Sequence, residues 1–316
     1  MTIVQRRRTS QRVLALVSVA AATATAVGTA FAAPGPADAD LRLARAQAAH
    51  HDGSPAGRGH GRPGAAPGEV VTPTFDLTAV DRQSGNLYLY FADGQGGFGP
   101  RYDVGVDYSS SAAVADVDRD KDGHGDGFWN FQKDGLLTYT WSDGHDAYTK
   151  DIGPGWQIYD KVLSPGDLGG AGDADVIGRD ASGVLWLYLG YPDGELTARH
   201  RVGGGWGQYT EIAGQGDLDD DGHADIVARD RAGTLWLYRG TGDYTNPFEA
   251  RTRIGGGWNT YDRILSVGDL DGDGHADLVA RSSGGDLYRY SGNGNVSDPF
   301  DNAVKIGRGF DIYNLL

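Results

Sequence analysis

Cysteine is absent from this chain of 316 residues, so no disulfide can stabilise its fold. Methionine is nearly absent, since Met1 is the only one. The sequence also has no Gly-x-Ser-x-Gly elbow, His-Glu-x-x-His pair or phosphate loop, so it lacks common signatures of enzymes. Positive charge is scarce: the formal net charge is -15, which argues against nucleic acid or an anionic membrane surface as a partner.

The one long apolar run stands at the N-terminus. Residues 1–32 are typical of a secretory signal peptide, with four arginines, an apolar stretch over 13–30 and a small-x-small cleavage site at Ala30–Ala32. We expect cleavage there and a secreted, extracellular protein without membrane attachment. The alternative is an uncleaved anchor, because the run is nearly long enough to span a bilayer.

Residues 33–72 are rich in Pro, Gly, Ala and Arg and show no apolar period. Such a segment buries too little apolar surface to offset its loss of conformational entropy, so we predict a disordered linker. His50, His51 and His60 lie within it. A weak transition-metal site is conceivable there, but solvated linker histidines are the favoured interpretation.

Glycine and aromatic residues are abundant, with 51 glycines and 10% aromatics. From about residue 73 the chain repeats, and the clearest marker is Ile254-Gly-Gly-Gly-Trp258-Asn-Thr-Tyr261. The aromatic residue of this marker recurs at intervals of 48, 50, 52 and 52 residues, as Tyr108, Trp156, Trp206, Trp258 and Phe310. A period of about 50 residues is that of one four-stranded unit of a propeller or a similar array.

Each unit reads as an aromatic turn, a strand, an acidic loop and three further strands. The third of the four strands in a unit is Leu235–Tyr238 in one unit and Leu185–Tyr188 in another. The repeats begin at Asp76 just after a loop, and Phe310–Leu316 matches the strand before one. We therefore predict an all-β domain over residues 73–316, a five-bladed β-propeller closed by pairing of its N- and C-terminal segments. An open solenoid would need polar capping repeats, and neither end resembles one.

The acidic loop carries Asp at positions 1, 3, 5 and 9 and glycine at position 6. Alternating carboxylates in so short a run repel one another unless a cation lies between them, and calcium accepts six to eight oxygen ligands in flexible geometry. The backbone carbonyl of the histidine at position 7 can add a ligand, its side chain pointing to solvent. The predicted calcium ligands are Asp118, Asp120, Asp122, His124 and Asp126; Asp217, Asp219, Asp221, His223 and Asp225; and Asp269, Asp271, Asp273, His275 and Asp277.

These loops predict about three bound Ca²⁺ ions. An EF-hand is excluded, because it needs a glutamate at position 12 and flanking helices. A fourth loop keeps Asp167, Asp173 and Asp175 but has Gly169 and Ala171 at positions 3 and 5, so we expect weak or no calcium binding there.

Asp-x-Asp-x-Asp-Gly-x-x-Asp loops between strands at this period resemble the FG-GAP or VCBS repeats of integrin α-subunits and many exported bacterial proteins. The resemblance covers about residues 73–316 and implies calcium binding by these aspartates within propeller blades. The repeat is shorter than in the seven-bladed integrin type. The Ile-Gly-x-Gly-Trp turn and the count of five are similar to tachylectin-type five-bladed lectins, an analogy of fold that transfers no sugar-contacting residue.

The favoured function is a non-catalytic, calcium-stabilised extracellular binding module, expected to be a monomer. Its ligand would be a glycan, a cell-wall polymer or another protein. Trp156, Trp206 and Trp258 could stack on sugar rings, although wedges between blades are the favoured interpretation of these residues. Two alternatives stay open: a structural or adhesion protein without a discrete ligand, and a hydrolase with its site in the propeller channel.

Overall fold

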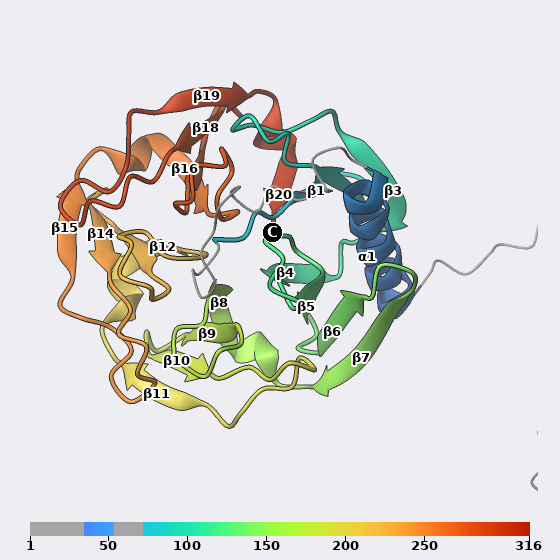
Figure 1. The fold of residues 1–316 in the computed structure, drawn as a ribbon, viewed down its shortest axis with the longest axis horizontal. Helices are drawn as coiled ribbons and strands as arrows, with labels where there is room; N and C mark the ends of the chain where they lie inside the picture. The colour runs from blue at the N-terminus through green and yellow to red at the C-terminus, as the bar shows by residue number, and fades with distance from the viewer. Residues whose placement is uncertain (1–34, 54–71) are drawn as a thin grey trace, which may run out of the picture. The chain divides into compact units, whose positions relative to one another are not determined.

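The computed structural model describes residues 35–53 and 72–316, so the predicted signal peptide and residues 54–71 lie outside the described residues. The described part within Pro34–Leu316 contains one α-helix, α1, and five four-stranded antiparallel sheets set around a ring (Figure 1). This arrangement confirms the five-bladed β-propeller. No helix in these two stretches is both long and apolar enough to cross a membrane.

The blades are numbered here in the order of the chain, and each has the same strand order from the centre of the ring outward. Blade 1 has β20 (Tyr313–Leu315), β1 (Leu77–Asp81), β2 (Asn86–Tyr90) and β3 (Tyr102–Asp107). Blade 2 has β4 (Ser111–Val117), β5 (Gly127–Gln132), β6 (Leu137–Ser142) and β7 (Ala147–Gly153). Blade 3 has β8 (Tyr159–Gly166), β9 (Asp175–Asp180), β10 (Leu185–Tyr188) and β11 (His200–Gly203). Blade 4 has β12 (Tyr209–Ala213), β13 (Ile226–Asp230), β14 (Leu235–Tyr238) and β15 (Thr252–Gly255). Blade 5 has β16 (Tyr261–Leu265), β17 (Leu278–Ser282), β18 (Leu287–Tyr290) and β19 (Val304–Gly307).

Blade 1 is assembled from both ends of the propeller. Strand β20 pairs antiparallel with β1, with Ala79 opposite Leu315 and Asp81 opposite Tyr313. The predicted split of one unit, with its first strand supplied by the C-terminal segment, is therefore confirmed.

The third strand of each blade shows why these residues form packed sheets. In β14, Leu235 and Leu237 are fully buried, while Trp236 and Tyr238 on the other face are half-buried. Both faces of a strand packed between neighbouring sheets contact other side chains, which explains strands that are apolar at consecutive positions.

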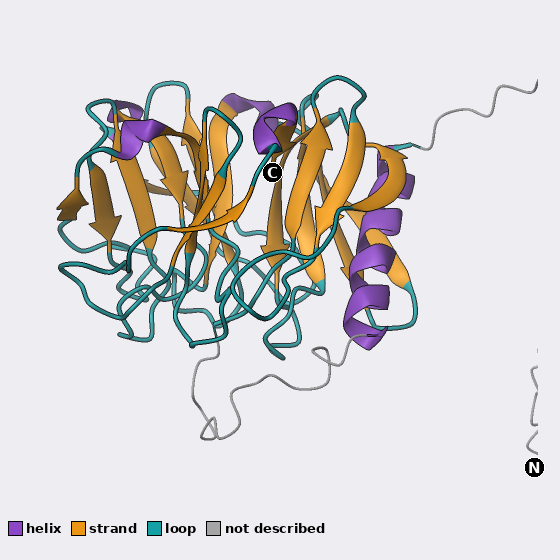
Figure 2. Ribbon diagram, turned by 90° about the horizontal axis from the view of Figure 1, so that it is seen from above, coloured by secondary structure: helices purple, strands orange, loops and turns teal. Residues whose placement is uncertain are grey.

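A short 3₁₀ helix precedes the first strand in four of the blades: η1 (Trp156–Ile158), η2 (Trp206–Gln208), η3 (Trp258–Thr260) and η4 (Phe310–Ile312). The residue before η2 is Gly205, whose φ of 92° is a left-handed conformation that side chains with a Cβ rarely adopt. These helices lie at one end of the strands, and long loops lie at the other end (Figure 2).

A buried arginine in the second strand joins blades 3, 4 and 5 to the turn that follows each of them. Arg229 Nη1 donates hydrogen bonds to the backbone carbonyls of Trp258, at 3.0 Å, and of Tyr261. Arg179 and Arg281 make the equivalent pairs of bonds in blades 3 and 5.

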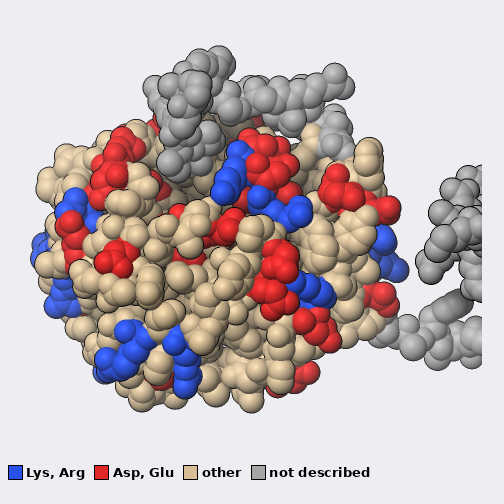
Figure 3. All heavy atoms as spheres, turned by 60° about the horizontal axis from the view of Figure 1, so that its bottom comes forward, with Lys and Arg blue, Asp and Glu red and all other residues tan. Residues whose placement is uncertain are grey.

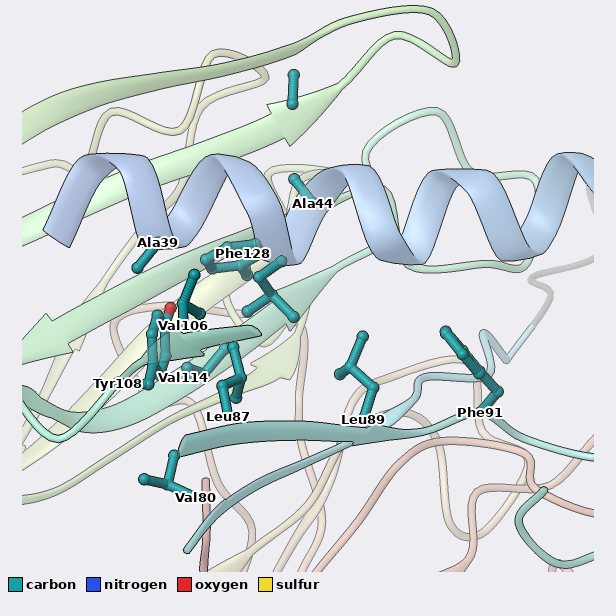
Figure 4. Packing of buried hydrophobic residues seen from close by; sticks show 12 residues of the cluster. Ala39, Ala44, Val80, Leu87, Leu89, Phe91, Val106, Tyr108, Val114 and Phe128 are labelled. Atoms are coloured by element: carbon teal, nitrogen blue, oxygen red, sulfur yellow. The ribbon is translucent and has the colours of Figure 1, made fainter. Parts of the chain in front are cut away.

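Helix α1 (Pro36–Gly53) corrects the prediction that residues 33–72 form a disordered linker. The helix lies against β3, β6 and β7, and Leu43 is fully buried in a cluster with Leu87 and Phe128 (Figure 4). The fully buried Asp40 accepts a hydrogen bond from Tyr108 Oη at 2.6 Å. The buried residues of the helix share one face, which mixes apolar and polar side chains and is therefore hidden in the composition: Ala39, Asp40, Leu43, Ala44 and Gln47.

Blade 2 has room for α1 because it carries small polar side chains where blade 3 carries a large aromatic one. Thr138 pairs with Asn130 across blade 2, at the position where Trp186 pairs with Gly178 in blade 3. Thr138 Oγ1 and Asn130 Nδ2 both donate to the Asp40 carboxylate at 2.8 Å. The helix therefore supplies the contacts that an aromatic side chain makes elsewhere, and α1 is part of the propeller core.

We expect Leu43→Ala to lower the free energy of unfolding by about 2–5 kcal/mol, because it leaves a cavity in a well-packed cluster. Arg42 lies on the exposed side of the same helix, so Arg42→Ala should change it by no more than about 0.5 kcal/mol. Urea unfolding measures both variants. Equal, small effects would show that α1 does not contribute to propeller stability.

Candidate functional site: acidic loops and the cavity beside them

The three complete acidic loops occupy the same place in three blades. They join the first strand to the second, between β4 and β5, β12 and β13, and β16 and β17. They lie at the end of the strands opposite the 3₁₀ helices, which we call the acidic-loop face (Figure 2). Asp and Glu gather in several patches in the view of Figure 3.

In each loop, three carboxylates offer oxygen atoms within 4.8 Å of one another. The groups found among the described residues are Asp118, Asp120 and Asp122; Asp217, Asp219 and Asp225; and Asp269, Asp271 and Asp273. Calcium–oxygen distances of about 2.3–2.6 Å place ligand oxygens at this separation around one ion. Asp126, Asp221 and Asp277, also predicted as ligands, lie outside these groups.

The aspartate at position 1 shapes its loop through the backbone. The Asp269 carboxylate accepts hydrogen bonds from the N–H groups of Gly272 at 2.7 Å and Gly274 at 2.8 Å. Asp167 accepts bonds from Gly170 and Gly172 at 2.7 and 2.8 Å in the incomplete loop of blade 3. The incomplete loop thus has the same local fold, although glycine and alanine replace the carboxylates at positions 3 and 5.

The aspartate at position 9 anchors the loop to the turn after the third strand. Asp225 is fully buried and accepts hydrogen bonds from the N–H groups of Leu218 at 3.0 Å and Gly240 at 2.7 Å. Burial raises the pKa of Asp225 and of Asp277 to about 8, despite these bonds. Burial likewise raises the pKa of Asp175 to about 7.

Two arginines contact acidic loops, which the sequence analysis missed: Arg239 directly after β14, and Arg289 in β18. Arg239 Nη1 lies 3.3 Å from Asp219 Oδ2, and Arg289 Nη2 lies 3.1 Å from Asp271 Oδ2. The other oxygen of Asp271, Oδ1, is buried and has no hydrogen-bond partner in the protein. A buried carboxylate oxygen left unpaired is costly, so the donor set of this loop fits a bound cation.

The histidines at position 7 are half-buried, which corrects the prediction that their side chains point to solvent. His275 Nδ1 lies 2.9 Å from Asp220 Oδ1, in the loop of the preceding blade. The His124 ring stacks on His51 of α1, with centroids 5.1 Å apart. These side chains therefore contact neighbouring elements of the fold.

Trp156, Trp206 and Trp258 are buried in the core. This agrees with the favoured interpretation of these residues as wedges between blades, and not with stacking on sugar rings. They are 9%, 6% and 8% exposed, and each packs against the tyrosine that ends the third strand of its blade. Trp206 and Tyr238, for example, have ring centroids 4.6 Å apart. Their faces are occupied by protein, so they do not offer a platform for a sugar.

A second aromatic motif recurs in blades 1, 3 and 4, with an arginine stacked on the aromatic residue that follows the first leucine of the third strand. The guanidinium carbon of Arg199 lies 4.1 Å from the Trp186 ring centroid, and that of Arg251 lies 4.0 Å from Trp236. Arg101 and Tyr88 form the equivalent pair in blade 1. In these three blades the arginine stands three residues before a Val-Gly or Ile-Gly pair, which is the sequence signal that could have identified the motif.

A cavity of about 460 Å³ lies on the acidic-loop face, lined by residues of blades 2, 3 and 4. Thr72, Pro73 and Phe75 line it, and their segment is held by backbone hydrogen bonds. Thr74 N donates to Gly123 O at 2.9 Å in blade 2, and Phe75 N donates to Val267 O at 2.8 Å beside blade 5. The other walls include Asp116, Trp129, Tyr139, Ser164, Tyr191 and Gln215.

Two acidic residues near this cavity lie close to α1. Burial raises the pKa of Asp116 to about 7, and the negative charge of Asp76 adds to the shift. His51 Nε2 of α1 lies 3.6 Å from Asp76 Oδ2. The helix therefore borders the polar groups at the centre of the propeller as well as its apolar core.

Without calcium, we expect the propeller to become less stable as the pH rises from about 5 to about 8. Asp225 and Asp277 hold a proton in the folded state up to about pH 8, whereas in the unfolded chain they ionise near pH 4. The folded state binds more protons in this window, so raising the pH favours unfolding. Thermal unfolding in chelator at several pH values tests this, and a melting temperature that increases with pH would contradict it.

Comparisons with known proteins support the repeat. Residues 217–280 match the FG-GAP-like repeat family and include two of the complete acidic loops. No curated protein sequence matches the chain significantly.

The search of solved structures found the BP39L lectin of Burkholderia pseudomallei at 12% identity. The match covers 75% of this chain and 71% of that chain, with a TM-score of 0.46. A triple mutant of AofleA from Arthrobotrys oligospora has 12% identity, 77% and 76% coverage and a TM-score of 0.45. A mutant of Aleuria aurantia lectin in complex with α-methyl-L-fucoside has 12% identity, 75% and 79% coverage and a TM-score of 0.38. Such low identities and scores carry no conclusion about a ligand. The chain is a five-bladed β-propeller whose residues 217–280 are similar to FG-GAP-like repeats.

Proposed function

We propose that this chain is an exported, non-catalytic binding module, stabilised by calcium, that recognises a glycan, a cell-wall polymer or a protein. The proposal rests on a cluster of three aspartates that recurs at the same position in three blades. In each cluster the carboxylate oxygens lie within 4.8 Å of one another. A repeated set of oxygen ligands on one face supports a structural role for the ions, because one catalytic centre would not need three copies.

Calcium would act on folding. Extracellular calcium modules bind with dissociation constants of about 0.1–1 mM. At a tenfold excess of free calcium, one site stabilises the folded state by about 1.4 kcal/mol, so three independent sites contribute about 4 kcal/mol. That is a sizeable part of a typical domain's net stability. Bound ions would thus take the stabilising role that disulfides have in many exported proteins, and this chain has no cysteine.

Export is supported by the signal-peptide pattern of residues 1–32. Recognition is supported by the cavity of about 460 Å³ on the acidic-loop face. A glycan array and a pull-down on isolated cell-wall material, both with calcium present, test the recognition. If neither showed binding, the proposal would give way to a display or adhesion protein without a discrete ligand.

Calcium should raise the melting temperature of the propeller, and calorimetry should count about three bound ions. Asp120→Asn should reduce the count by one and leave the fold intact in excess calcium, because Asp120 is an exposed ligand candidate of one loop only. Asp151→Asn makes the same charge change on an exposed strand of the same blade and should leave three ions bound. If Asp120→Asn still bound as many calcium ions as the unchanged protein, the loop over residues 118–126 would not be a calcium site.

Arg239→Gln should increase the calcium affinity of the loop over residues 217–225 by about three- to fivefold. The arginine lies 3.3 Å from Asp219, and partly exposed ion pairs of this kind contribute up to about 1 kcal/mol. Arg253→Gln, in the outer strand of the same blade, removes the same charge at an exposed position. Calcium titrations compare the two, and equal affinities would show that Arg239 does not compete with the ion.

A further inference from the structure

The acidic loops of blades 4 and 5 are joined directly to one another. Asp220 is at position 4 of the blade 4 loop, and its Oδ1 accepts a hydrogen bond from His275 Nδ1, at position 7 of the blade 5 loop, over 2.9 Å. Beside this contact, Ala276 N of the blade 5 loop donates to Asp217 O of the blade 4 loop at 3.3 Å. The two loops therefore share one side-chain contact and one backbone contact.

These contacts connect predicted ligands of the two calcium sites. Within the blade 4 loop, Asp220 N donates to Asp217 Oδ1 at 2.8 Å. Within the blade 5 loop, His275 N donates to Asp273 Oδ1 at 2.9 Å. Asp217 and Asp273 each belong to one of the carboxylate groups described above. A continuous row of hydrogen bonds thus runs from a ligand of one site, through Asp220 and His275, to a ligand of the other.

The backbone holds the two side chains of this contact in place. Gly294, in the loop between β18 and β19, has a φ of 69°, and a Cβ there would lie 2.6 Å from Asp220 Oδ2 and 3.4 Å from His275 Cε1. Asp220 itself has a φ of 63°, a left-handed conformation that Asp and Asn adopt more readily than most residues. The contact is therefore built into the loops of two blades, although Asp220 is 57% exposed.

The other acidic loops have a different residue at position 4. It is Gly170 in blade 3 and Gly272 in blade 5, which have no side chain to reach a neighbouring loop. In blade 2 it is Lys121, whose Nζ lies 3.9 Å from Asp173 of the incomplete loop. Among the described residues, Asp220 is therefore the position-4 side chain that joins two complete acidic loops.

We propose that Asp220 is a positioning residue that couples the calcium sites of blades 4 and 5, so that an ion in one loop strengthens binding in the other. The inference rests on the proposed calcium role and adds that these two sites are not independent. An ion held by Asp217 fixes the backbone at Asp220, which in turn holds His275. Because the N–H of His275 orients Asp273 and its carbonyl is a predicted ligand, the second ion meets a loop that is already ordered. Such coupling is reciprocal.

The test measures calcium binding to the full chain by isothermal titration calorimetry in about 0.15 M salt, which screens charges beyond about 8 Å. Asp120→Asn is present throughout, because the blade 2 loop is joined to blade 5 through Thr74 and its site should be silent. Adding Asp219→Asn or Asp273→Asn then leaves one site, whose binding constant is measured alone. The coupling factor is the product of the two constants of the two-site protein divided by the product of the single-site constants.

We expect a coupling factor of about three- to fivefold, the scale of one partly exposed hydrogen bond. Two bound cations repel one another, so sites without a link would give a factor of one or less. Such a value would overturn the inference.

Two variants of Asp220 separate the hydrogen bond from the charge. Asp220→Asn and Asp220→Gly both remove one negative charge, but only asparagine keeps an oxygen for His275. Both residues tolerate the φ of this position, and Gly170 and Gly272 have φ values of 76° and 77° at the same place in their loops, so both variants should fold. We expect Asp220→Asn to keep most of the coupling factor and Asp220→Gly to lower it at least twofold.

The outcomes separate this inference from the proposed function. If both loops bind calcium with a factor of one or less, the coupling is wrong and the calcium role stands. If neither loop binds calcium, the calcium role itself fails. If the factor stays equally high in Asp220→Gly, the loops are coupled without this side chain, and the positioning role of Asp220 is wrong.

Discussion

The propeller depends on a buried guanidinium that ties each of three blades to the next. Arg179, Arg229 and Arg281 each share Nη1 between two backbone carbonyls of the following turn and first strand. A buried arginine without these partners would be strongly destabilising, so the spacing between blades is fixed by a polar contact as well as by apolar packing. The aromatic turn is thereby held at one end of the blade, and the acidic loop lies at the other end.

The boundary between blades 1 and 2 shows what replaces this contact. Val80 of β1 pairs with Leu87, as Arg229 of β13 pairs with Leu235, so an apolar residue stands where the arginine would be. Val80 is 4% exposed and belongs to the cluster that includes Leu43 of α1. The helix contributes apolar packing through Leu43 and a polar link through Asp40. Without α1, the boundary between blades 1 and 2 would lose both the apolar packing and the hydrogen bonds that the helix supplies.

Sequence periodicity was sufficient to predict the fold, because the turn before the first strand recurs in four blades and the acidic loop, complete or incomplete, recurs in four. The third strands at Leu185–Tyr188 and Leu235–Tyr238 have the predicted boundaries. Helix α1 could not be predicted from the repeat, because it occurs once and packs against residues far away in sequence. The same reason applies to the cavity: Ser164, Tyr191 and Gln215 come from three separate segments, and only the closed ring places them together.

The acidic loop of blade 2 connects the cation sites to the cavity. Blade 4 has Arg239 directly after β14, near Asp219 and Asp221 at 3.3 and 4.0 Å, whereas blade 2 has Trp141 at that position. The carboxylates of Asp118, Asp120 and Asp122 therefore converge without this arginine, and burial raises the pKa of Asp118 to about 6. The repulsion between carboxylates that a bound cation would relieve is therefore greatest in this loop. Its residues Asp118, Arg119 and Lys121 also line the cavity. Ions that stabilise the fold would for this reason also set the shape and charge of the proposed binding site.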